Sequence, residues 1–323
     1  MNAISTTPSV IFFGTPEFAA AQLKAILEAA IPVKAVVTAP DKPAGRGKKM
    51  QQSAVKKLAA EKGLAVLQPR NLKDQAFLTE LAHFNADIFV VVAFRMLPEL
   101  VWKMPLLGTF NLHASLLPQY RGAAPINRVI MNGETETGLT TFLLNDKIDE
   151  GNILLQKRMP IARDETAGSL HDRMMELGKG LVVETVKGLA NNGLSPKPQA
   201  EAGKLQSAPK IFKEDCRIDW NNDLITIYNQ IRGLSPYPAA FTMLINKGLG
   251  EELLLKVYEA DIVQAPSAME KFQLVTDNKS FIKVSHPEGF LILKQIQAPG
   301  KKVMQVRDFL NGFQLTGNWQ IAF

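Results

Sequence analysis

Asn, His, Ser, Tyr and Arg side chains gather in one short stretch of the chain, residues 111–127, which reads NLHASLLPQYRGAAPIN. Such a mixture of polar groups with two prolines and a glycine is poor material for a hydrophobic core. A histidine can exchange a proton near neutral pH, and an asparagine amide can donate to a developing oxyanion. Asn111 and His113 are therefore candidate catalytic residues, with a purely structural histidine as the alternative for His113. The structural interpretation is favoured for the other histidines, which lack such neighbours: His83, His171 and His286.

The alternation of side chains in residues 109–113 (TFNLH) predicts that Asn111 and His113 act together. In a β-strand every second side chain points to the same face, so both groups would share one face of a sheet. Open α/β sheets bind ligands beyond the carboxyl ends of their strands, and the chain leaves such an end after His113.

A carboxylate beside the imidazole would orient the ring and favour its charged form. The polar loop NDKIDEG, residues 145–151, offers Asp146 and Asp149 for this role. Their spacing from His113 does not choose between them, so both stay candidates at this point.

The common phosphate-binding and metal-binding motifs are absent from the sequence. Gly14 is followed by Thr15 and Pro16 rather than by a G-x-G-x-x-G series, no P-loop motif occurs, and no two histidines have helical metal spacing. The single cysteine, Cys216, excludes an internal disulfide and Cys-rich zinc or iron–sulfur sites within one chain. These observations disfavour a dinucleotide dehydrogenase and predict a metal-free enzyme in a reducing compartment.

Apolar runs alternate with helical spacing through the first half of the chain, which is typical of β-α-β units. A first helix is expected to open at Thr15-Pro16-Glu17, because a hydroxyl cap, a proline and an acid suit a helix N-terminus. The alternation predicts an α/β fold with a doubly wound, mostly parallel sheet. The expected strands are residues 10–13, 33–37, 65–67, 88–93, 109–113, 139–144 and 153–156, and the later helices are residues 53–61, 74–83 and 167–190.

The length of 323 residues predicts roughly two domains. Residues 191–207 are rich in Pro, Gly, Asn and Ser, so we expect a linker between domains 1–190 and 208–323. The second domain shows one helical pattern and short strand-like runs, which predict a small β-barrel or sandwich. The helical positions are Leu224, Ile227 and Ile231, and the runs are residues 253–257, 281–284 and 291–296.

Hydrophobic residues make up 46% and charged residues 21% of the chain, values near the globular average. No apolar stretch approaches the roughly 18 residues of a membrane span, and no targeting segment is readable at the N-terminus. We therefore expect a cytoplasmic protein that does not bind a membrane.

The net charge of +6 is concentrated in one segment, because six cations and no acid lie between residues 42 and 57. This cluster predicts a loop that binds a polyanion, and a solvated surface is the alternative. The six residues are Lys42, Arg46, Lys48, Lys49, Lys56 and Lys57.

Three segments of the first domain resemble the methionyl-tRNA formyltransferases: FFGTPEF (12–18), TAPDKPAGRGKK (38–49) and NLHASLLP followed by YRGAAPI (111–126). The similarity continues in the second domain, through KIFKEDCRIDW, IRGLSPYPA and DFLNGF. The resemblance implies a Rossmann-like formyltransferase domain followed by an OB-like barrel that binds tRNA. It also implies transfer of a formyl group from 10-formyltetrahydrofolate to initiator methionyl-tRNA for translation initiation.

By this resemblance the catalytic residues are Asn111, His113 and Asp149. Asn145 and Glu150 depart from the D-x-G-x-D-T-G loop that is common in the family, whereas Asp149 keeps its place. The implied folate contacts are Phe94, Arg95, Met96, Leu97, Ser115, Leu116, Leu117 and Pro118. The implied tRNA contacts are Lys42, Arg46, Lys48 and Lys49.

Two other functions remain open from the sequence. The first is a formyltransferase that acts on a small amine, such as a nucleotide-linked amino sugar or glycinamide ribonucleotide. The second is an RNA-binding protein on an inactive transferase scaffold. The basic loop and second domain disfavour the first, and the intact Asn111, His113 and Asp149 disfavour the second. The expected partners are initiator methionyl-tRNA and the folate co-substrate, with the chain acting as a monomer.

Overall fold

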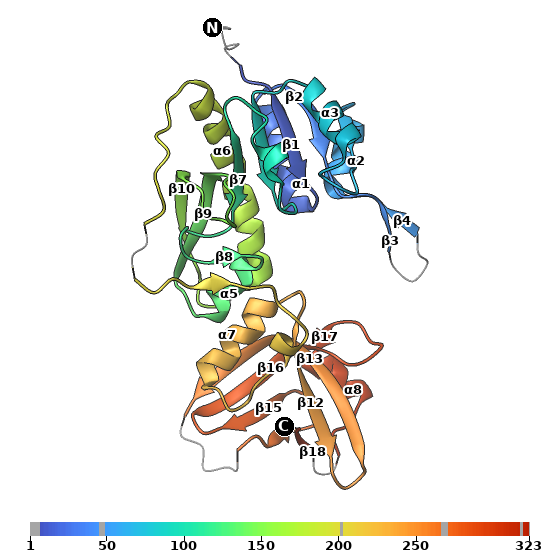
Figure 1. Ribbon diagram of the computed structural model, residues 1–323. Coiled ribbons are helices and arrows are strands. Elements are labelled where there is room, and N and C mark those ends of the chain that lie inside the picture. Colours follow the sequence, from blue (N-terminus) through green and yellow to red (C-terminus); the bar gives the residue numbers. More distant parts are fainter. Residues whose placement is uncertain (1–6, 45–48, 201–202, 266–270, 317–318, 323) are drawn as a thin grey trace. The chain divides into compact units, whose positions relative to one another are not determined.

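The computed structural model describes residues 7–44, 49–200, 203–265, 271–316 and 319–322 (Figure 1). The chain divides into two units. The first comprises Met1–Gly122, Thr137–Pro160 and Asp172–Ala208, and the second comprises Ala123–Glu136, Ile161–His171 and Pro209–Phe323. The sequence-based limits of the two domains and their linker stay a prediction.

A seven-stranded sheet, with the order β10-β9-β7-β6-β1-β2-β5, forms the centre of the first unit. The pairs β7–β6, β6–β1, β1–β2 and β2–β5 are parallel, and β9 runs antiparallel to β7. The predicted doubly wound, mostly parallel sheet is thereby confirmed. The strands are β1 Val10–Gly14, β2 Val33–Val37, β5 Ala65–Leu67, β6 Ile88–Val92, β7 Thr109–His113, β9 Glu136–Leu143 and β10 Ile153–Pro160.

Apolar side chains on both faces of β1 are fully buried, as expected for a strand inside a covered parallel sheet. Ile11 and Phe13 pack in one cluster with Phe77 and Leu81 of helix α3. The alternate residues Val10 and Phe12 are buried on the opposite face. The helices with residues in this unit are α1 Glu17–Glu28, α2 Ala54–Glu61, α3 Gln75–His83, α4 Glu99–Trp102 and α6 Ala167–Ala190.

Two short strand pairs lie outside the main sheet of the first unit. Strands β3 (Lys42–Ala44) and β4 (Lys49–Gln51) form an antiparallel hairpin that extends away from the sheet (Figure 1). Strand β8 (Arg121–Gly122) pairs in parallel with β11 (Ser207–Ala208). Gly122 permits this pairing, because a side-chain Cβ there would lie 2.4 Å from the Ala208 carbonyl oxygen.

The second unit contains a nearly closed antiparallel barrel with the strand order β14-β15-β16-β13-β12-β18, and β17 pairs with β16. A bridge between Gln273 and Gln320 joins its two edges. Its strands are β12 Ala240–Asn246, β13 Glu251–Gln264, β14 Leu274–Thr276, β15 Ile282–His286, β16 Gly289–Gln297, β17 Met304–Gln305 and β18 Trp319–Ile321. The helices are α5 Pro125–Met131, α7 Leu224–Leu234, α8 Val306–Gly312 and the short 3-10 helix Glu214–Cys216.

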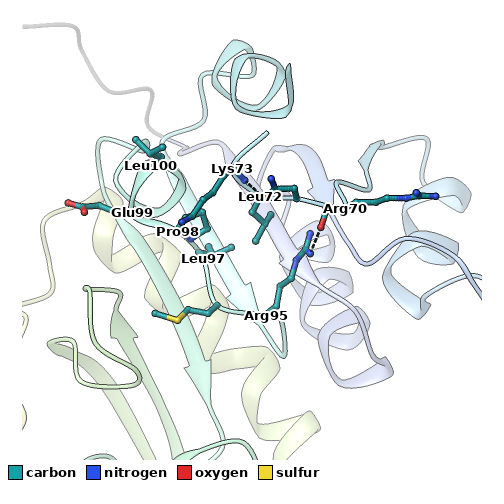
Figure 2. Close-up of a pocket in the computed structure, with 10 residues that line it drawn as sticks. Arg70, Leu72, Lys73, Arg95, Leu97, Pro98, Glu99 and Leu100 are labelled. Carbon is teal, nitrogen blue, oxygen red and sulfur yellow. Dashed lines mark hydrogen bonds between the residues drawn. The ribbon is translucent and has the colours of Figure 1, made fainter. Parts of the chain in front are cut away.

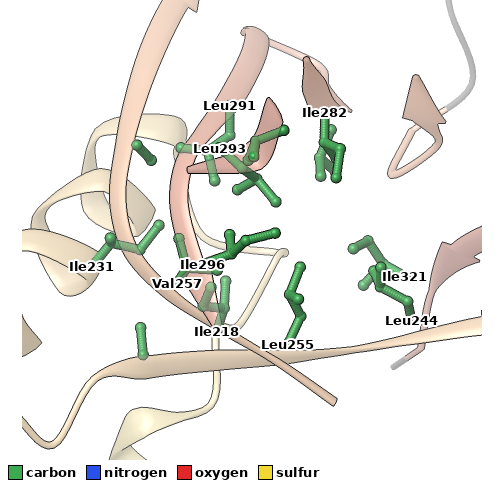
Figure 3. Close-up of a cluster of buried hydrophobic side chains, with 14 of the residues drawn as sticks. Ile218, Ile231, Leu244, Leu255, Val257, Ile282, Leu291, Leu293, Ile296 and Ile321 are labelled. Carbon is green, nitrogen blue, oxygen red and sulfur yellow. The ribbon is translucent and has the colours of Figure 1, made fainter. Parts of the chain in front are cut away.

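Inward-facing aliphatic side chains fill the barrel (Figure 3). Leu255 and Val257 of β13 lie in the same cluster as Leu291 of β16 and Ile231 of α7. The expected runs 253–257 and 291–296 lie within the longer strands β13 and β16, whose ends add polar residues, and the run 281–284 overlaps β15 except for its first residue. Within the described ranges, no helix has the length and apolarity needed to cross a membrane.

Candidate active site

His113 and Asp149 face each other in the first unit, at the end of β7. The Nδ1 atom of His113 lies 3.9 Å from Oδ2 of Asp149, and the two side chains are 8% and 16% exposed. This distance is an ionic contact rather than a hydrogen bond. Asp146 is exposed in the same loop, so the geometry favours Asp149 over Asp146 as the partner of the imidazole.

Backbone groups that follow β7 hold both members of this pair. The Nε2 atom of His113 donates to the Tyr120 carbonyl at 2.9 Å, since a carbonyl oxygen only accepts. The Gly122 N–H donates to Oδ2 of Asp149 at 2.9 Å. Nε2 is thus occupied by the protein, and Nδ1 is the ring nitrogen that remains for Asp149 and for a substrate.

The loop between β9 and β10 presents Asp149 in the left-handed backbone region, with φ of +55°. Asn145 turns the chain into this loop, because its Oδ1 accepts from the Lys147 N–H at 2.9 Å. Asparagine performs here the turn-forming role of an aspartate. Glu150, the second departure from the family pattern, forms an ion pair with Arg121 at 3.2 Å.

Asn111 lies two residues before His113 on β7, with Phe142 as its neighbour on β9. Strand alternation places both side chains on one face, with Cα atoms roughly 6.6 Å apart. Asn111 is half-buried, and within the described part of the chain its side-chain amide has no hydrogen-bond partner. A half-buried amide without an internal partner is suited to bind a polar ligand group.

The segment of residues 115–118 is anchored to β9 and β10 rather than open. Thr140 Oγ1 donates to the Ser115 carbonyl at 2.7 Å, and Gln156 Nε2 donates to the Leu117 carbonyl at 2.9 Å. Ser115 and Leu117 are buried, whereas Leu116 and Pro118 are partly exposed. The folate contacts expected from Ser115 to Pro118 stay predictions, and only Leu116 and Pro118 have side chains partly accessible to a ligand.

A pocket of about 550 Å³ opens beside the segment that follows β6 (Figure 2). Arg95, Met96 and Leu97 line it, together with residues 70–73 and 98–100. Phe94 packs against Phe13 of the core instead, with ring centroids 5.8 Å apart. Because β6 and β7 are parallel neighbours, this segment and residues 115–118 leave the same edge of the sheet.

In Figure 2 the Arg95 side chain reaches back to the loop before α3. Its Nη1 donates to the Arg70 carbonyl at 2.8 Å, and its Nη2 donates to the Pro69 carbonyl. Lys73 also lines the pocket. The lining combines three cations and one acid, Glu99, with apolar side chains, and this net positive, partly apolar lining suits a ligand with an aromatic body and carboxylate groups.

Of the four predicted tRNA contacts, Lys42 lies in β3 and is exposed. Lys49 lies in β4, and Arg46 and Lys48 lie outside the described residues. These four contacts stay predictions.

At the base of the hairpin, the Lys56 Nζ lies 2.6 Å from Oδ2 of Asp41. The Lys56 ammonium and the Gln68 amide both donate to this carboxylate and hold the pKa of Asp41 below its usual range. Asp41 directly precedes the stretch of six cations in the sequence. Because its carboxylate pairs with Lys56, the positive charge of Lys56 is neutralised within the protein and is not free for a polyanion.

The remaining candidate groups have structural surroundings. His286 is buried, its Nε2 donates to the Asn222 carbonyl at 3.0 Å, and its Nδ1 accepts from the Glu288 N–H. Burial raises the pKa of the Cys216 thiol, which disfavours the reactive thiolate. Among the residues that the structure describes, no group of three or more His, Cys, Asp or Glu side chains is arranged to hold a metal ion.

Two family models match the chain. The family model of the formyl transferases matches residues 9–186, which contain Asn111, His113 and Asp149. The model of the formyl transferase C-terminal domain matches residues 210–314, which contain most of the barrel.

Curated relatives cover almost the whole chain. The methionyl-tRNA formyltransferase of Bacteroides thetaiotaomicron is 49% identical over 315 residues, 97% of this chain and 98% of the relative. That of Parabacteroides distasonis is 50% identical over 318 residues, with the same coverage of 97% and 98%.

A solved structure shares the fold at lower identity. The N-formyltransferase from Helicobacter canadensis, in complex with folinic acid and dTDP-3-aminofucose, has a TM-score of 0.65 and 21% identity, and the match covers 90% of this chain and 98% of that one. The extended matches to both domain models and the near-half identity to full-length relatives lead to one conclusion: this chain belongs to the methionyl-tRNA formyltransferase family.

Proposed function

We propose that this chain transfers the formyl group of 10-formyltetrahydrofolate to the α-amino group of initiator methionyl-tRNA, giving N-formylmethionyl-tRNA for translation initiation. The observation that carries this proposal is the His113–Asp149 pair beside Asn111 on β7, inside the region that matches the formyl transferases. The name of the relatives supports methionyl-tRNA as the acceptor.

The nucleophile in this reaction needs little activation. A free α-amino group has a pKa of about 7.7–8.0, so a useful neutral fraction exists near pH 7. The folate supplies the activated formyl group. Attack on the formyl carbon turns its oxygen into an oxyanion, and the Asn111 amide is placed to donate to it, a contribution of about 10²–10³ in rate.

His113 acts through its Nδ1 atom, because Nε2 donates to the Tyr120 carbonyl. In the protonated ring Nδ1–H points toward the Asp149 side, where the carboxylate 3.9 Å away stabilises the positive charge. The ring then helps to stabilise the oxyanion. The new C–N bond leaves the attacking amine with a proton to lose, and N10 needs a proton as the C–N10 bond breaks. The His113–Asp149 pair, or a water that it positions, carries the proton from the amine to N10, a contribution of about 10²–10⁴.

The pocket beside β6 fits the folate. Its volume of about 550 Å³ lies in the range of ligand sites. Its lining combines apolar groups with Arg70, Lys73 and Arg95 against a single acid, Glu99. A folate carries an aromatic body and a glutamate tail, so apolar contacts suit the rings and cations suit the carboxylates. The Helicobacter canadensis relative was solved with folinic acid, a formyl folate, which supports a folate co-substrate.

The tRNA would bind through Lys42 and Lys49 of the β3–β4 hairpin, together with Arg46 and Lys48, which lie outside the described residues. Neutralising phosphates with these cations makes binding depend on salt. We place the reaction in the cytoplasm and propose that the chain acts as a monomer without a metal ion.

Transfer of labelled formyl from 10-formyltetrahydrofolate tests the proposal. Methionyl initiator tRNA, uncharged initiator tRNA, free methionine and a nucleotide-linked amino sugar are offered in parallel. The proposal predicts label on the charged tRNA alone. Label on the amino sugar instead would assign a small-amine acceptor, and salt-dependent tRNA binding without any transfer would favour a binding protein.

A further inference from the structure

The backbone of the Asp149 loop needs support from outside the loop. Asp149 has φ of +55°, a sparsely populated region for a residue with a side chain. The bond from the Gly122 N–H fixes the carboxylate of Asp149 but not the peptide groups around it. Other groups must therefore hold the loop against β7.

Gln199 supplies this support from a distant part of the chain. Its Nε2 donates to the Asp149 carbonyl at 2.8 Å and to the Gly151 carbonyl at 2.9 Å. One amide group thus holds the two peptide carbonyls on either side of Glu150. Gln199 lies in the segment whose composition predicted only a linker between domains.

Arg121 fixes the orientation of the Gln199 amide. Its Nε and Nη2 atoms donate to the Gln199 Oε1 at 3.1 and 2.7 Å. Because arginine only donates, the amide oxygen must face Arg121 and the NH₂ group must face the loop. The Nη1 atom of Arg121 pairs with Glu150 at 3.2 Å, so the arginine contacts both Gln199 and the loop that Gln199 holds.

The segment that carries Gln199 is hydrogen-bonded to the rest of the first unit both before and after Gln199. Lys197 exchanges two backbone hydrogen bonds with Ile153, at 2.8 and 2.9 Å. Farther along, the Gln206 carbonyl accepts from the Tyr120 N–H at 2.7 Å. Tyr120 is the residue whose carbonyl holds His113. The segment therefore contacts the supports of both His113 and Asp149.

We propose that Gln199 is a positioning residue for formyl transfer: its amide holds the Asp149 loop so that the carboxylate stays beside Nδ1 of His113. Gln199 acts through Asp149 and has no contact with the reacting atoms. The inference rests on the proposed function, because both depend on the Asp149–His113 pair taking part in formyl transfer.

The variant Gln199→Glu isolates the donor role of the amide. Glutamate has nearly the same shape and still accepts from Arg121, but it cannot donate to the two loop carbonyls. We expect kcat to fall about 10–100-fold, the effect of losing two orienting hydrogen bonds. KM for the folate and for methionyl-tRNA should stay within about twofold, since neither binding surface changes. The melting temperature should stay within about 3 °C of wild type, because the new carboxylate pairs with Arg121.

Asn191→Asp is the matched control, because it makes the same amide-to-carboxylate change on an exposed residue of the same segment, away from the supports of His113 and Asp149. Its kcat should equal that of wild type. A Gln199→Glu kcat within about twofold of wild type would overturn the inference. An equal loss in Asn191→Asp would overturn it too, because the added charge would then be the cause. A Gln199→Glu loss that comes with a raised KM or a collapsed melting temperature would also overturn it.

The NMR signals of the His113 ring give a readout that does not require turnover. They should shift in Gln199→Glu and stay unchanged in Asn191→Asp, because only the first variant releases Asp149. Unchanged His113 signals in Gln199→Glu would contradict the inference even if wild type transferred no formyl group. Absence of transfer by wild type, with the expected NMR shift, would reject the proposed function and leave the positioning role supported.

Discussion

Replacing Asp149 by asparagine removes one negative charge from the site and little else. Asparagine is nearly isosteric, tolerates the left-handed backbone at least as well as aspartate, and keeps an oxygen that can accept from the Gly122 N–H. The change therefore separates the charge of Asp149 from the shape of its loop. Asp146→Asn is the matched control, since it makes the same change on an exposed residue of the same loop.

The size of the effect follows from the separation of 3.9 Å between His113 Nδ1 and Asp149 Oδ2. At an effective dielectric constant of about 20, opposite unit charges at that distance attract by about 4 kcal/mol. The side chains are only 8% and 16% exposed, so solvent screens a minor part of this attraction. If about 3–4 kcal/mol of it stabilises the charged ring in the transition state, its loss lowers kcat about 10²–10³-fold.

Initial rates of labelled formyl transfer at saturating folate and methionyl-tRNA measure this loss. Asp149→Asn should lower kcat by that factor with KM values within about twofold, and Asp146→Asn should match wild type. An Asp149→Asn enzyme that keeps more than about a tenth of the wild-type kcat would refute the electrostatic reasoning. So would an equal loss in Asp146→Asn.

Asn111→Ala should lower kcat about 10²–10³-fold with KM nearly unchanged, as steady-state kinetics will show, because an oxyanion donor is removed. Trp220→Phe should lower the free energy of unfolding by about 1–3 kcal/mol, and with it the urea midpoint. The reason is that the buried Thr242 hydroxyl loses the indole N–H that donates to it at 3.0 Å. Asp223 caps α7, and the bond it accepts from the Thr226 N–H lowers its pKa from 3.8. Asp223→Ala should therefore lower the free energy of unfolding by about 0.5–1 kcal/mol at pH 7. Below about pH 4 the carboxylate of wild type takes up its proton and its contribution is lost, so unfolding curves should show the difference between the two proteins narrowing.

The central strands β1 and β6 could be predicted because they are short apolar runs that are buried on both faces. The period of two in residues 109–113 placed Asn111 and His113 on one face, and β7 confirms that strand with the same limits. In the barrel the same reasoning found only the apolar centres of the strands. Strand β13 extends from Glu251 to Gln264 and alternates buried with polar exposed residues, so its ends lack a continuous apolar run.

The partners of the candidate site could not be predicted, because they depend on contacts between residues distant in sequence. Spacing along the chain gave equal weight to Asp146 and Asp149. The family resemblance chose Asp149, and the folded loop places Asp149 beside His113. Tyr120 holds His113 through its backbone carbonyl. Every residue has this group, so the side chain at position 120 does not indicate the contact. Gln199 lies 50 residues beyond Asp149 in a Pro- and Gly-rich segment, where nothing local indicates its role.

Formyl transfer by His113→Ala tests most directly whether His113 is the centre of the reaction. The formylmethionine released from tRNA is quantified by mass spectrometry, and tRNA binding by the same preparation is measured at two salt concentrations. Wild type should formylate methionyl-tRNA, while His113→Ala should lose at least about 100-fold in rate and keep its tRNA affinity and salt dependence. A His113→Ala enzyme that turns over like wild type would contradict the mechanism.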